Sequence, residues 1–492
     1  MNYKMMSRFL SLICIAEAVF MLPALAISLY DGQGRAAIAF AITIGIAAVL
    51  YVIFKLLSRN CANHLTAKEG FVCTAASWIL MSLVGCLPFI ISGEIPHFVD
   101  ALFEIVSGFT TTGASILADV EALSRGMLYW RSFSHWVGGM GVLVFLLAIV
   151  PGGKKSDGFT MHLFRAESPG PEVGKLVPKL RQTALWLYGT YIALSLLNFA
   201  FLMFGDMNWF EALCTMFGTA GTGGFGVRGD SLGSFSPYIQ NVTTVFMLLF
   251  GVNFSCYYLI LLGQFRSVIR DEELRLYFCI VAVSIALITW NIVDMYNTFG
   301  EGLRHAAFQV ASIISTTGYS TVDFDMWPTF SKGILTVLMI TGACAGSTCG
   351  GMKCARVLLL FKGLRRNIRQ MVHPNRVEVV RVNGRAVDEK VMSGVNGYLS
   401  AYVLILFLSF VVLCFDQFPS DPNFSGIGTN FSAVLACFNN VGPGFEAIGP
   451  TMHFGNFNIL SKLVLTFDML AGRLEIFPIL LFFSAGSWRK RS

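Results

Sequence analysis

Four short segments of this chain resemble one another, and each is centred on glycine. They recur at intervals of roughly 100 residues along a chain of 492 residues, and each lies between two long apolar stretches. The segments are Thr110–Ser115, Ala220–Phe225, Ser315–Ser320 and Asn439–Gly444. Similarity at a repeated spacing indicates internal structural repeats. We therefore expect four related units that place equivalent glycines in equivalent positions.

The apolar stretches indicate a polytopic membrane protein. Hydrophobic residues make up 55% of the chain and charged residues only 13%, which is more apolar than a soluble globular protein requires. Ten stretches of roughly 20 residues, enough to cross a bilayer, are centred near residues 20, 47, 80, 143, 194, 251, 285, 345, 406 and 471. The first, Phe9–Leu29, is too long for the apolar part of a cleaved signal and has no obvious small-residue cleavage site.

A shorter apolar segment precedes each glycine motif. It contains about 10–13 residues, which is too few to span a bilayer. The economical structure is a short helix that enters and leaves by the same face, with its end buried in protein. These segments are 100–109, 210–220, 305–315 and 431–440, and the central glycines are Gly113, Gly223, Gly318 and Gly442.

The expected fold is an all-α polytopic membrane protein. Two leading helices precede four helix–re-entrant loop–helix repeats, which are arranged with pseudo-fourfold symmetry around a central pore. The expected units are 1–64 (two leading helices), 65–155 (repeat one), 156–268 (repeat two), 269–372 (repeat three, with a broken inner helix) and 373–492 (repeat four).

The residue types of the four motifs suit a path for cations. A cation that gives up its water needs oxygens in its place, and backbone carbonyls supply them. Glycine permits the backbone angles that turn several carbonyls to one side, and the short helices would direct the negative ends of their dipoles at the axis. A single motif could also reflect close helix packing or a nucleotide loop such as Gly221–Gly226, but no β-strand precedes these glycines.

The distribution of charge predicts the orientation. If the amino terminus is cytoplasmic, most of the 35 Lys and Arg fall on the inner side, and both termini are cytoplasmic. The inner basic residues include Lys154, Lys155, Arg165, Lys175, Lys179, Arg181 and the range Lys362–Lys390. An opposite excess of acids would raise the cation concentration at the outer mouth. These acids include Glu94, Asp100, Asp119, Glu121, Asp206, Glu211, Asp323 and Asp325.

Other functional classes lack support in the sequence. The 12 cysteines are expected to be small buried side chains. Cys344, Cys349 and Cys354 have no nearby histidine or carboxylate to complete a zinc site. The seven histidines are scattered and no nucleophile motif appears, so we expect no enzyme activity. We also expect no nucleic-acid partner, and no bound cofactor besides the transported cation.

Several longer motifs carry a family resemblance that covers nearly the whole chain. They are Trp130–Arg131, Trp136–Gly141, Gly342–Lys353, Asn439–Phe445 and Ala471–Ile476. With these motifs the chain resembles the Trk/Ktr/HKT superfamily of potassium transporters, and most closely its bacterial TrkH members. The resemblance implies potassium uptake across the bacterial inner membrane through a carbonyl-lined selectivity filter that an intramembrane loop gates.

The resemblance implies three filter residues in each repeat. They are Thr111, Thr112, Gly113, Gly221, Thr222, Gly223, Thr316, Thr317, Gly318, Asn440, Val441 and Gly442. Relatives that pass sodium carry serine in place of the first-repeat glycine, so Gly113 favours potassium. The fourth segment departs from the threonine pattern at Val441 and Pro443. This departure leaves open a sodium-passing or sodium-coupled member of the same superfamily.

Small and polar residues interrupt the third inner helix from Gly342 to Gly351. Close helix packing could explain them, but a non-helical loop across the water path is the preferred interpretation. The resemblance implies that this loop is a gate. The expected gate residues are Gly342, Gly346, Ser347, Thr348, Gly350, Gly351, Lys353 and Arg473.

Arg473 lies near the middle of the last apolar stretch, where an unpaired cation costs at least a few kcal/mol. Asp468 and Glu475 are its candidate partners. Facing the path below the filter, Arg473 would be an electrostatic barrier to the ion, and the alternative is a buried ion pair that joins helices. For Lys353 the alternative is an ammonium group that extends to the cytoplasm.

The resemblance also implies partners. They are a second copy of the chain in a homodimer, membrane lipid, and a cytosolic TrkA-like ring that binds a regulatory nucleotide, either NAD or ATP/ADP. The basic range Lys362–Lys390 is the expected docking site for the ring, although topology explains its charge equally well. Channel-like passage and symport with protons or sodium both stay open. An ion-binding subunit of a pump is a further alternative, which would need an ATPase partner.

Overall fold

The structure is a computed structural model that describes residues 2–59, 66–141, 180–375, 378–416, 418 and 424–488. Helices dominate these residues, and six of the described helices are long and apolar enough to cross a membrane. The expected all-α polytopic fold is confirmed. The apolar stretch centred near residue 143, the side chains of basic residues 154–181, and the expected unit boundaries at 64/65 and 155/156 lie outside the described part.

Each repeat contributes an outer, a short and an inner helix. The outer helices are α3 (Ala67–Gly85), α9 (Leu180–Met203), α14 (Glu272–Ile292) and α18 (Glu389–Leu413). The short helices are α5 (Phe98–Phe109), α10 (Trp209–Gly221), α15 (Phe299–Ile314) and α19 (Gly426–Phe438). The inner helices are α6 (Arg125–Gly139), α11 (Pro237–Phe250), α16 (Thr329–Thr341) and α20 (Ile459–Arg473).

Shorter elements connect or extend these helices. The α-helical ones are α4 (Leu87–Ser92), α12 (Phe254–Leu261), α13 (Phe265–Ile269), α17 (Cys354–Val372), α21 (Phe477–Phe483) and α22 (Ala485–Trp488). The 3-10 turns are Val293–Met295, Phe324–Met326, Glu446–Ile448 and Phe454–Asn456. Strands β1 (Arg381–Val382) and β2 (Arg385–Ala386) form an antiparallel hairpin.

The short helices lie close to the four predicted segments, and side-chain caps help to fix where three of them begin. Asn208 and Glu211 form a capping box at the start of α10, Thr298 caps α15 and Ser425 caps α19. Such caps satisfy backbone N–H groups that lack a partner in the first turn. These helices therefore begin up to several residues earlier than the apolar pattern suggested.

The four repeats close into a circle through contacts between neighbours. The inner helix of each repeat packs against the short helix of the next: α6 on α10, α11 on α15, α16 on α19, and α20 on α5. The last contact joins the fourth repeat to the first. This cyclic order is the expected pseudo-fourfold arrangement, and it places the ends of the short helices at the centre of the bundle.

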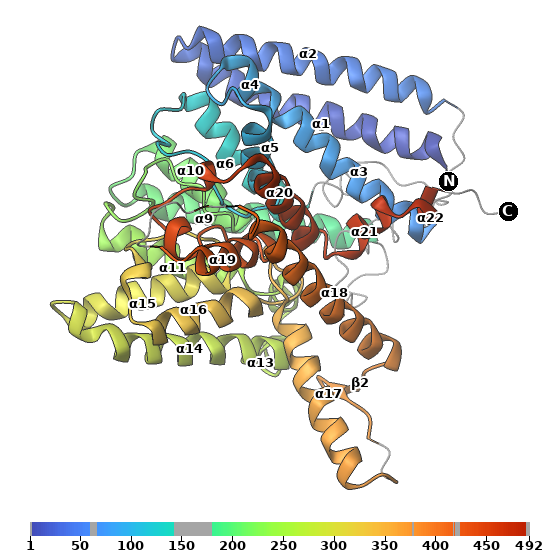
Figure 1. The fold of residues 1–492 in the computed structure, drawn as a ribbon, viewed down its shortest axis with the longest axis vertical. Coiled ribbons are helices and arrows are strands. Elements are labelled where there is room, and N and C mark those ends of the chain that lie inside the picture. The colour runs from blue at the N-terminus through green and yellow to red at the C-terminus, as the bar shows by residue number, and fades with distance from the viewer. Residues whose placement is uncertain are drawn as a thin grey trace.

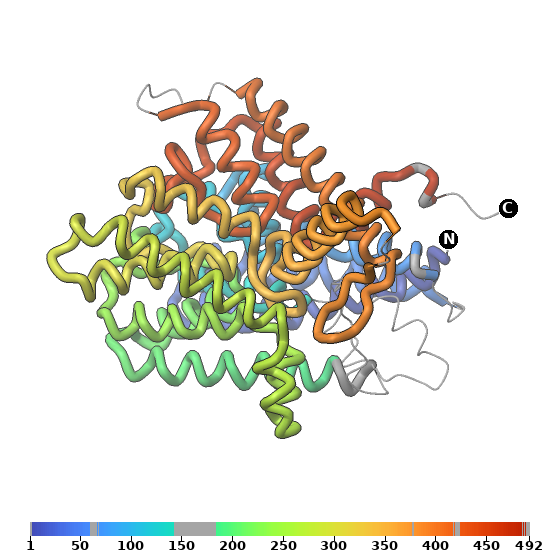
Figure 2. The backbone as a smooth tube through the Cα atoms, turned by 90° about the horizontal axis from the view of Figure 1, so that it is seen from below, coloured from blue at the N-terminus to red at the C-terminus, as the bar shows by residue number. Residues whose placement is uncertain are grey.

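The two leading helices, α1 (Tyr3–Tyr30) and α2 (Gly34–Leu57), form a hairpin that packs on the first repeat (Figure 1). α1 contacts both α3 and α6. At its start, the Tyr3 hydroxyl donates to the carbonyl of Trp488 in α22 at 3.3 Å. The two ends of the described chain therefore lie together on one side of the bundle (Figure 2).

Within the residues that the structure describes, three inner helices are interrupted, although the sequence predicted a break only in the third. α11 and α12 meet at an angle of 88° across Gly251–Asn253. Residues 342–353 separate α16 from α17, and Leu474–Ile476 separates α20 from α21. The apolar stretches near residues 251, 345 and 471 are thus not single straight spans. Asn253 caps α12, and Glu475 and Ile476 adopt positive φ angles of 54° and 69°, which an α-helix cannot contain.

Candidate functional site

All four short helices end in the same backbone turn. A residue one or two positions after the end of each helix adopts a left-handed conformation, with φ of 56° at Thr111, 55° at Thr222, 53° at Thr316 and 55° at Asn440. The next residue donates its N–H to the carbonyl five positions earlier, at 2.8 to 2.9 Å, in Thr112, Gly223, Thr317 and Val441. This is the Schellman arrangement, in which glycine is the usual left-handed residue. A threonine there costs roughly 1–2 kcal/mol, whereas asparagine adopts this conformation more readily.

A glycine with positive φ follows in each turn. The angles are 82° at Gly113, 78° at Gly224, 82° at Gly318 and 98° at Gly442. The residue equivalent to Gly113 is therefore Gly224, so the predicted alignment of Gly223 with Gly113 is wrong by one position. Glycines at 221, 223 and 224 made the sequence register ambiguous. We define the ring segments as residues 111–113, 222–224, 316–318 and 440–442, which leaves Gly221 as the last residue of α10.

The ring segments touch one another in a closed circle. The last residue of each ring segment is a glycine, and a Cβ atom added to it would collide with a carbonyl oxygen of the next segment. The separations would be 2.1 Å (Gly113 to Gly223), 2.0 Å (Gly224 to Thr317), 2.2 Å (Gly318 to Val441) and 2.6 Å (Gly442 to Thr112). The four segments therefore surround a common axis, and no side chain fits at these glycines.

Several polar side chains of the ring segments are hydrogen-bonded within the protein, although Thr111 Oγ1 has no partner among the described residues. Thr110 Oγ1 lies 2.8 Å from Thr112 Oγ1, and the equivalent pair in the third repeat, Ser315 Oγ and Thr317 Oγ1, lies 2.7 Å apart. Asn440 Nδ2 donates to Thr112 Oγ1 at 2.9 Å, which links the fourth segment to the first. The hydroxyls thus brace the turns, while the short helices direct the negative ends of their dipoles toward the ring.

A buried ion pair that the sequence analysis missed fastens the first two ring segments. Arg131 Nε lies 2.5 Å from Glu104 Oε1, and the two side chains are 3% and 0% exposed. Glu104 also accepts the N–H of Ile116 at 2.9 Å. Arg131 donates to the carbonyl of Gly226 at 3.1 Å and lies over the Phe225 ring at 3.4 Å.

His135, one turn further along α6, makes a second link between the same repeats. Its Nδ1 lies 2.7 Å from the carbonyl oxygen of Gly108, and its Nε2 accepts the N–H of Phe225 at 3.2 Å. The tautomer with hydrogen on Nδ1 satisfies both contacts. Ionisable residues inside apolar stretches are themselves a sequence signal, which Glu104 and His135 both carried.

The α16–α17 loop, residues 342–353, is non-helical as predicted, and positive φ angles occur at Gly342, Gly346, Gly351 and Lys353. On one side, Cys344 donates its N–H to the carbonyl of Gly251 at 3.1 Å. On the other, the N–H of Gly350 donates to Thr316 Oγ1 at 2.7 Å, and a Cβ at Gly350 would lie 2.4 Å from the carbonyl oxygen of Asn439. The loop therefore joins the break in the second inner helix to the third and fourth ring segments.

Arg473 ends α20 and contacts this loop, but its predicted carboxylate partners bind elsewhere. Its guanidinium donates to the carbonyls of Thr348 at 2.7 Å, Gly138 at 2.5 Å and Gly139 at 2.6 Å. Glu475 instead pairs with Arg356, and Asp468 accepts from the Ser409 hydroxyl at 2.8 Å. Carbonyls at the end of α6 carry the negative end of a helix dipole, which explains how they attract this cation.

Lys353 is buried rather than extended to solvent. It is 7% exposed, and its ammonium group donates to the carbonyl of Cys349 within the loop. The alternative of a side chain that reaches the cytoplasm is therefore wrong.

Several of the predicted outer acids have cationic partners. The pairs are Asp100 with Lys462 at 2.5 Å, Glu211 with Arg228 at 2.8 Å, and Asp325 with Lys332 at 3.3 Å. Asp206, in the loop between α9 and α10, accepts a hydrogen bond from the hydroxyl of Ser236, which directly precedes α11, and this bond lowers the pKa of the Asp206 carboxyl below its ordinary value. Paired acids contribute less to the field at the mouth than their number suggests.

Comparisons with known proteins agree with this geometry. Residues 35–490 match the model of the TrkH family, described as a cation transport protein. The chain is 34% identical over 504 residues, 100% of both chains, to the Trk system potassium uptake protein TrkH of Salmonella typhimurium (strain LT2). It is 35% identical over 444 residues, 88% of both chains, to the Trk system potassium uptake protein TrkG of Escherichia coli (strain K12).

A solved structure extends the similarity to three dimensions. The crystal structure of the potassium transporter TrkH from Vibrio parahaemolyticus superposes with a TM-score of 0.87 at 30% identity, covering 99% of this chain and 100% of the other. The matches confirm the family resemblance, and with it the expectation of a transporter rather than an enzyme. The chain belongs to the TrkH family of cation transport proteins.

Proposed function

We propose that this protein takes up potassium ions through the ring formed by residues 111–113, 222–224, 316–318 and 440–442. The closed circle of glycine-to-carbonyl contacts carries the proposal, because it gathers backbone from all four repeats around one axis. Relatives that match the chain over its whole length are named as potassium uptake proteins, and this agrees with the proposal.

In this proposal a potassium ion exchanges part of its water for carbonyl oxygens of the ring. Two features support the exchange. The backbone turns are held by hydrogen bonds and by braced hydroxyls, so the oxygens need little rearrangement when the ion arrives. The four short helices end at the ring, and their negative dipole ends favour cations over anions.

Two observations support potassium rather than sodium as the preferred ion. Glycine occupies the equivalent position in all four segments, at 113, 224, 318 and 442. The fourth segment contains Val441 in place of threonine, yet Asn440 and Gly442 keep the positive φ angles of the other repeats. The alternative remains a sodium-passing or sodium-coupled member of the superfamily, and tracer flux of rubidium against sodium separates the two. Channel-like passage is the simpler scheme, with symport as its alternative.

The α16–α17 loop is the gate in this proposal. Its contacts run from the second repeat to the third and fourth ring segments, so it lies across the route that an ion takes beyond the ring. Arg473 joins the loop to the end of α6 through the carbonyls of Thr348 and Gly138. Its positive charge opposes an ion leaving the ring, and opening requires the loop to release these contacts.

The protein resides in the bacterial inner membrane with both termini in the cytoplasm. The positive-inside rule supports this orientation, as does the placement of both described ends on one side of the bundle. A TrkA-like cytosolic ring that binds NAD or ATP/ADP regulates the gate, and it docks on the basic range Lys362–Lys390. The names of the relatives, which refer to a Trk system, support a further component.

A second copy of the chain covers an apolar stripe on α17. This helix extends beyond the rest of the bundle (Figure 1). Its exposed apolar residues are Phe361, Leu364, Ile368, Met371 and Val372, which share one helical face. Exposed apolar stripes of this kind mark contact surfaces, and a homodimer would bury it.

Replacing Gly113 by alanine tests the ring. The added Cβ would lie 2.1 Å from the carbonyl oxygen of Gly223, so the first two segments must move apart. We expect rubidium uptake to fall by at least about tenfold. Gly93→Ala is the matched control, because Gly93 has a similar φ of 80° but open space around it, and this variant should retain uptake. Uptake by Gly113→Ala at the level of the Gly93 control would contradict the proposal.

Deleting Gly346–Thr348 tests the gate. The deletion removes the carbonyl of Thr348 that Arg473 binds and shortens the loop below the ring. We expect rubidium flux into vesicles to rise several-fold, while the ratio of rubidium to sodium flux stays unchanged because the ring is intact. Unchanged or lower flux in a protein of normal thermal stability would show that the loop is not the gate.

The double variant Leu364→Glu/Ile368→Glu tests the homodimer. Two carboxylates on the apolar stripe would be buried without partners in the interface, so the variant should run as a monomer in detergent when its mass is measured by light scattering. Asn367→Glu, at an exposed position outside the stripe, is the control and should remain dimeric. A double variant with the mass of a dimer would exclude this surface from the interface.

A further inference from the structure

We infer that Glu273 is a positioning residue that latches the α16–α17 loop in its closed position. The inference rests on the proposed loop gate and identifies the contact that sets it. Glu273 lies in the first turn of α14, and its Oε1 accepts two backbone N–H groups, from Ala345 at 2.6 Å and from Ala355 at 3.1 Å. Ala345 belongs to the loop and Ala355 to the first turn of α17, so one carboxylate oxygen joins the loop to the helix that follows it.

The surroundings make this contact strong. Glu273 is 7% exposed, and hydrogen bonds to a buried charged acceptor are stronger than those between neutral groups. The N–H groups of Ala345 and Ala355 both need the Glu273 carboxylate as an acceptor. The N–H of Ala355 lies in the first turn of α17, where helix backbone has no partner of its own, and Ala345 lies in the non-helical loop between α16 and α17. Removal of the carboxylate would leave both amides without this partner.

The cytoplasmic hairpin β1–β2 holds the first turn of α14 in place. Its tip, Asn383–Gly384, forms a two-residue turn in which both residues have positive φ, 50° and 76°, as a tight hairpin requires. Asn383 Nδ2 donates to Asp271 Oδ2 at 2.7 Å, and Asn383 Oδ1 accepts the N–H of Glu272 at 2.9 Å. A shift of the hairpin would therefore act on the residues next to Glu273.

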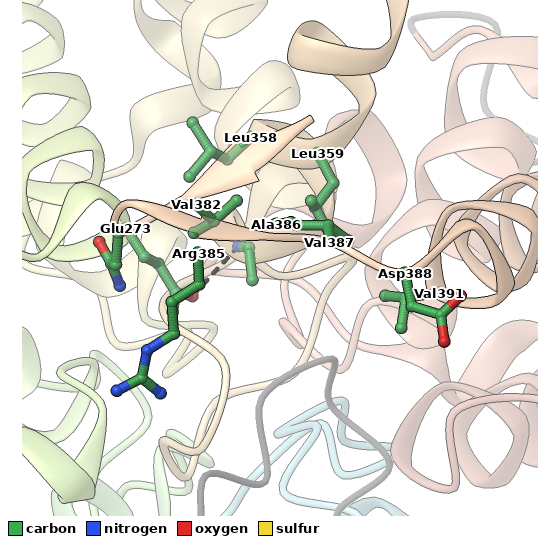
Figure 3. Close-up of a pocket in the computed structure, with 11 residues that line it drawn as sticks. Glu273, Leu358, Leu359, Val382, Arg385, Ala386, Val387, Asp388 and Val391 are labelled. Carbon is green, nitrogen blue, oxygen red and sulfur yellow. Dashed lines mark hydrogen bonds between the residues drawn. The ribbon is translucent and has the colours of Figure 1, made fainter. Parts of the chain in front are cut away.

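A cavity beside Glu273 provides space for the latch to open. It has a volume of about 220 Å³ and is lined by the hairpin, Leu358 and Leu359 of α17, and Val391 of α18 (Figure 3). Glu273 lines this cavity. Since a water molecule occupies roughly 30 Å³, the cavity has room for several waters that could solvate the carboxylate after it leaves the amides. The latch can thus release without disrupting the packed helices.

The test compares Glu273→Ala, Glu273→Gln and the unaltered full-length protein in inside-out membrane vesicles. We expect rubidium flux to rise by about tenfold in Glu273→Ala, as for the loss of a charge-assisted hydrogen bond, and less in Glu273→Gln, whose amide oxygen still accepts. The rubidium-to-sodium ratio and the half-saturating concentration should not change, because the ring is untouched. Glu301→Gln is the matched control. Glu272 itself is unsuitable because its carboxylate binds the hairpin; the control Glu301 likewise lies in the first turn of a helix, α15, but at the opposite end of α14 from Glu273, so flux should stay at the basal level.

Thiol labelling provides a second measurement, which should not change if Glu273 only stabilises the fold. Cys344, Cys349 and Cys354 are 0%, 2% and 0% exposed, so a membrane-impermeant maleimide should label them only after the loop is released. Glu273→Ala should therefore increase labelling at Cys349, measured by peptide mass spectrometry. Unchanged flux with unchanged labelling would overturn the latch. Lower flux and lower thermal stability without labelling would assign Glu273 a structural role only. Labelling without a rise in flux would instead show that the loop moves but is not the gate.

Discussion

The structure depends on the close approach of four backbone segments around one axis. At positions 113, 224, 318 and 442 the next segment's carbonyl is so near that only glycine fits. One repeat cannot create this arrangement, because each inner helix packs on the short helix of the following repeat and the circle closes only between α20 and α5. The four related segments of the sequence are thus required together, and this explains why all four adopt the same strained turn.

Buried charged groups hold this centre in place from several directions. Arg131 and Glu104 connect the first short helix to the chain that follows the second ring segment. Such a pair adds little net stability, yet loss of one partner is costly, so it fixes which segments meet. The α16–α17 loop is held by two opposite charges. Arg473 binds its carbonyl at Thr348, and Glu273 binds its amide at Ala345. Movement of the loop must break both contacts. A change at either Arg473 or Glu273 can therefore affect the position of the loop.

The sequence was sufficient to predict the architecture, because the lengths of the apolar stretches and the spacing of the repeats can be read along the chain without knowledge of three-dimensional contacts. These two properties predicted the short helices, and the run of small and polar residues from Gly342 to Gly351 predicted the interruption of the third inner helix. The alignment of Gly223 with Gly113 failed because several adjacent glycines fit the motif, and only the backbone angles identify Gly224. The partners of Arg473 and the contact from Glu273 to Ala345 could not be predicted, since they join residues far apart in sequence. Breaks after Phe250 and Arg473 were missed because the apolar pattern continues through them.

The most direct test of the account is anomalous X-ray scattering from crystals of the full-length protein grown in rubidium. We predict rubidium peaks on the axis enclosed by residues 111–113, 222–224, 316–318 and 440–442, at distances from their carbonyl oxygens that indicate direct coordination. Weaker peaks should appear when sodium replaces most of the rubidium. Rubidium bound only away from this axis, or an axis that stays empty of ions at high rubidium concentration, would contradict the claim that the ring replaces the water of the transported ion.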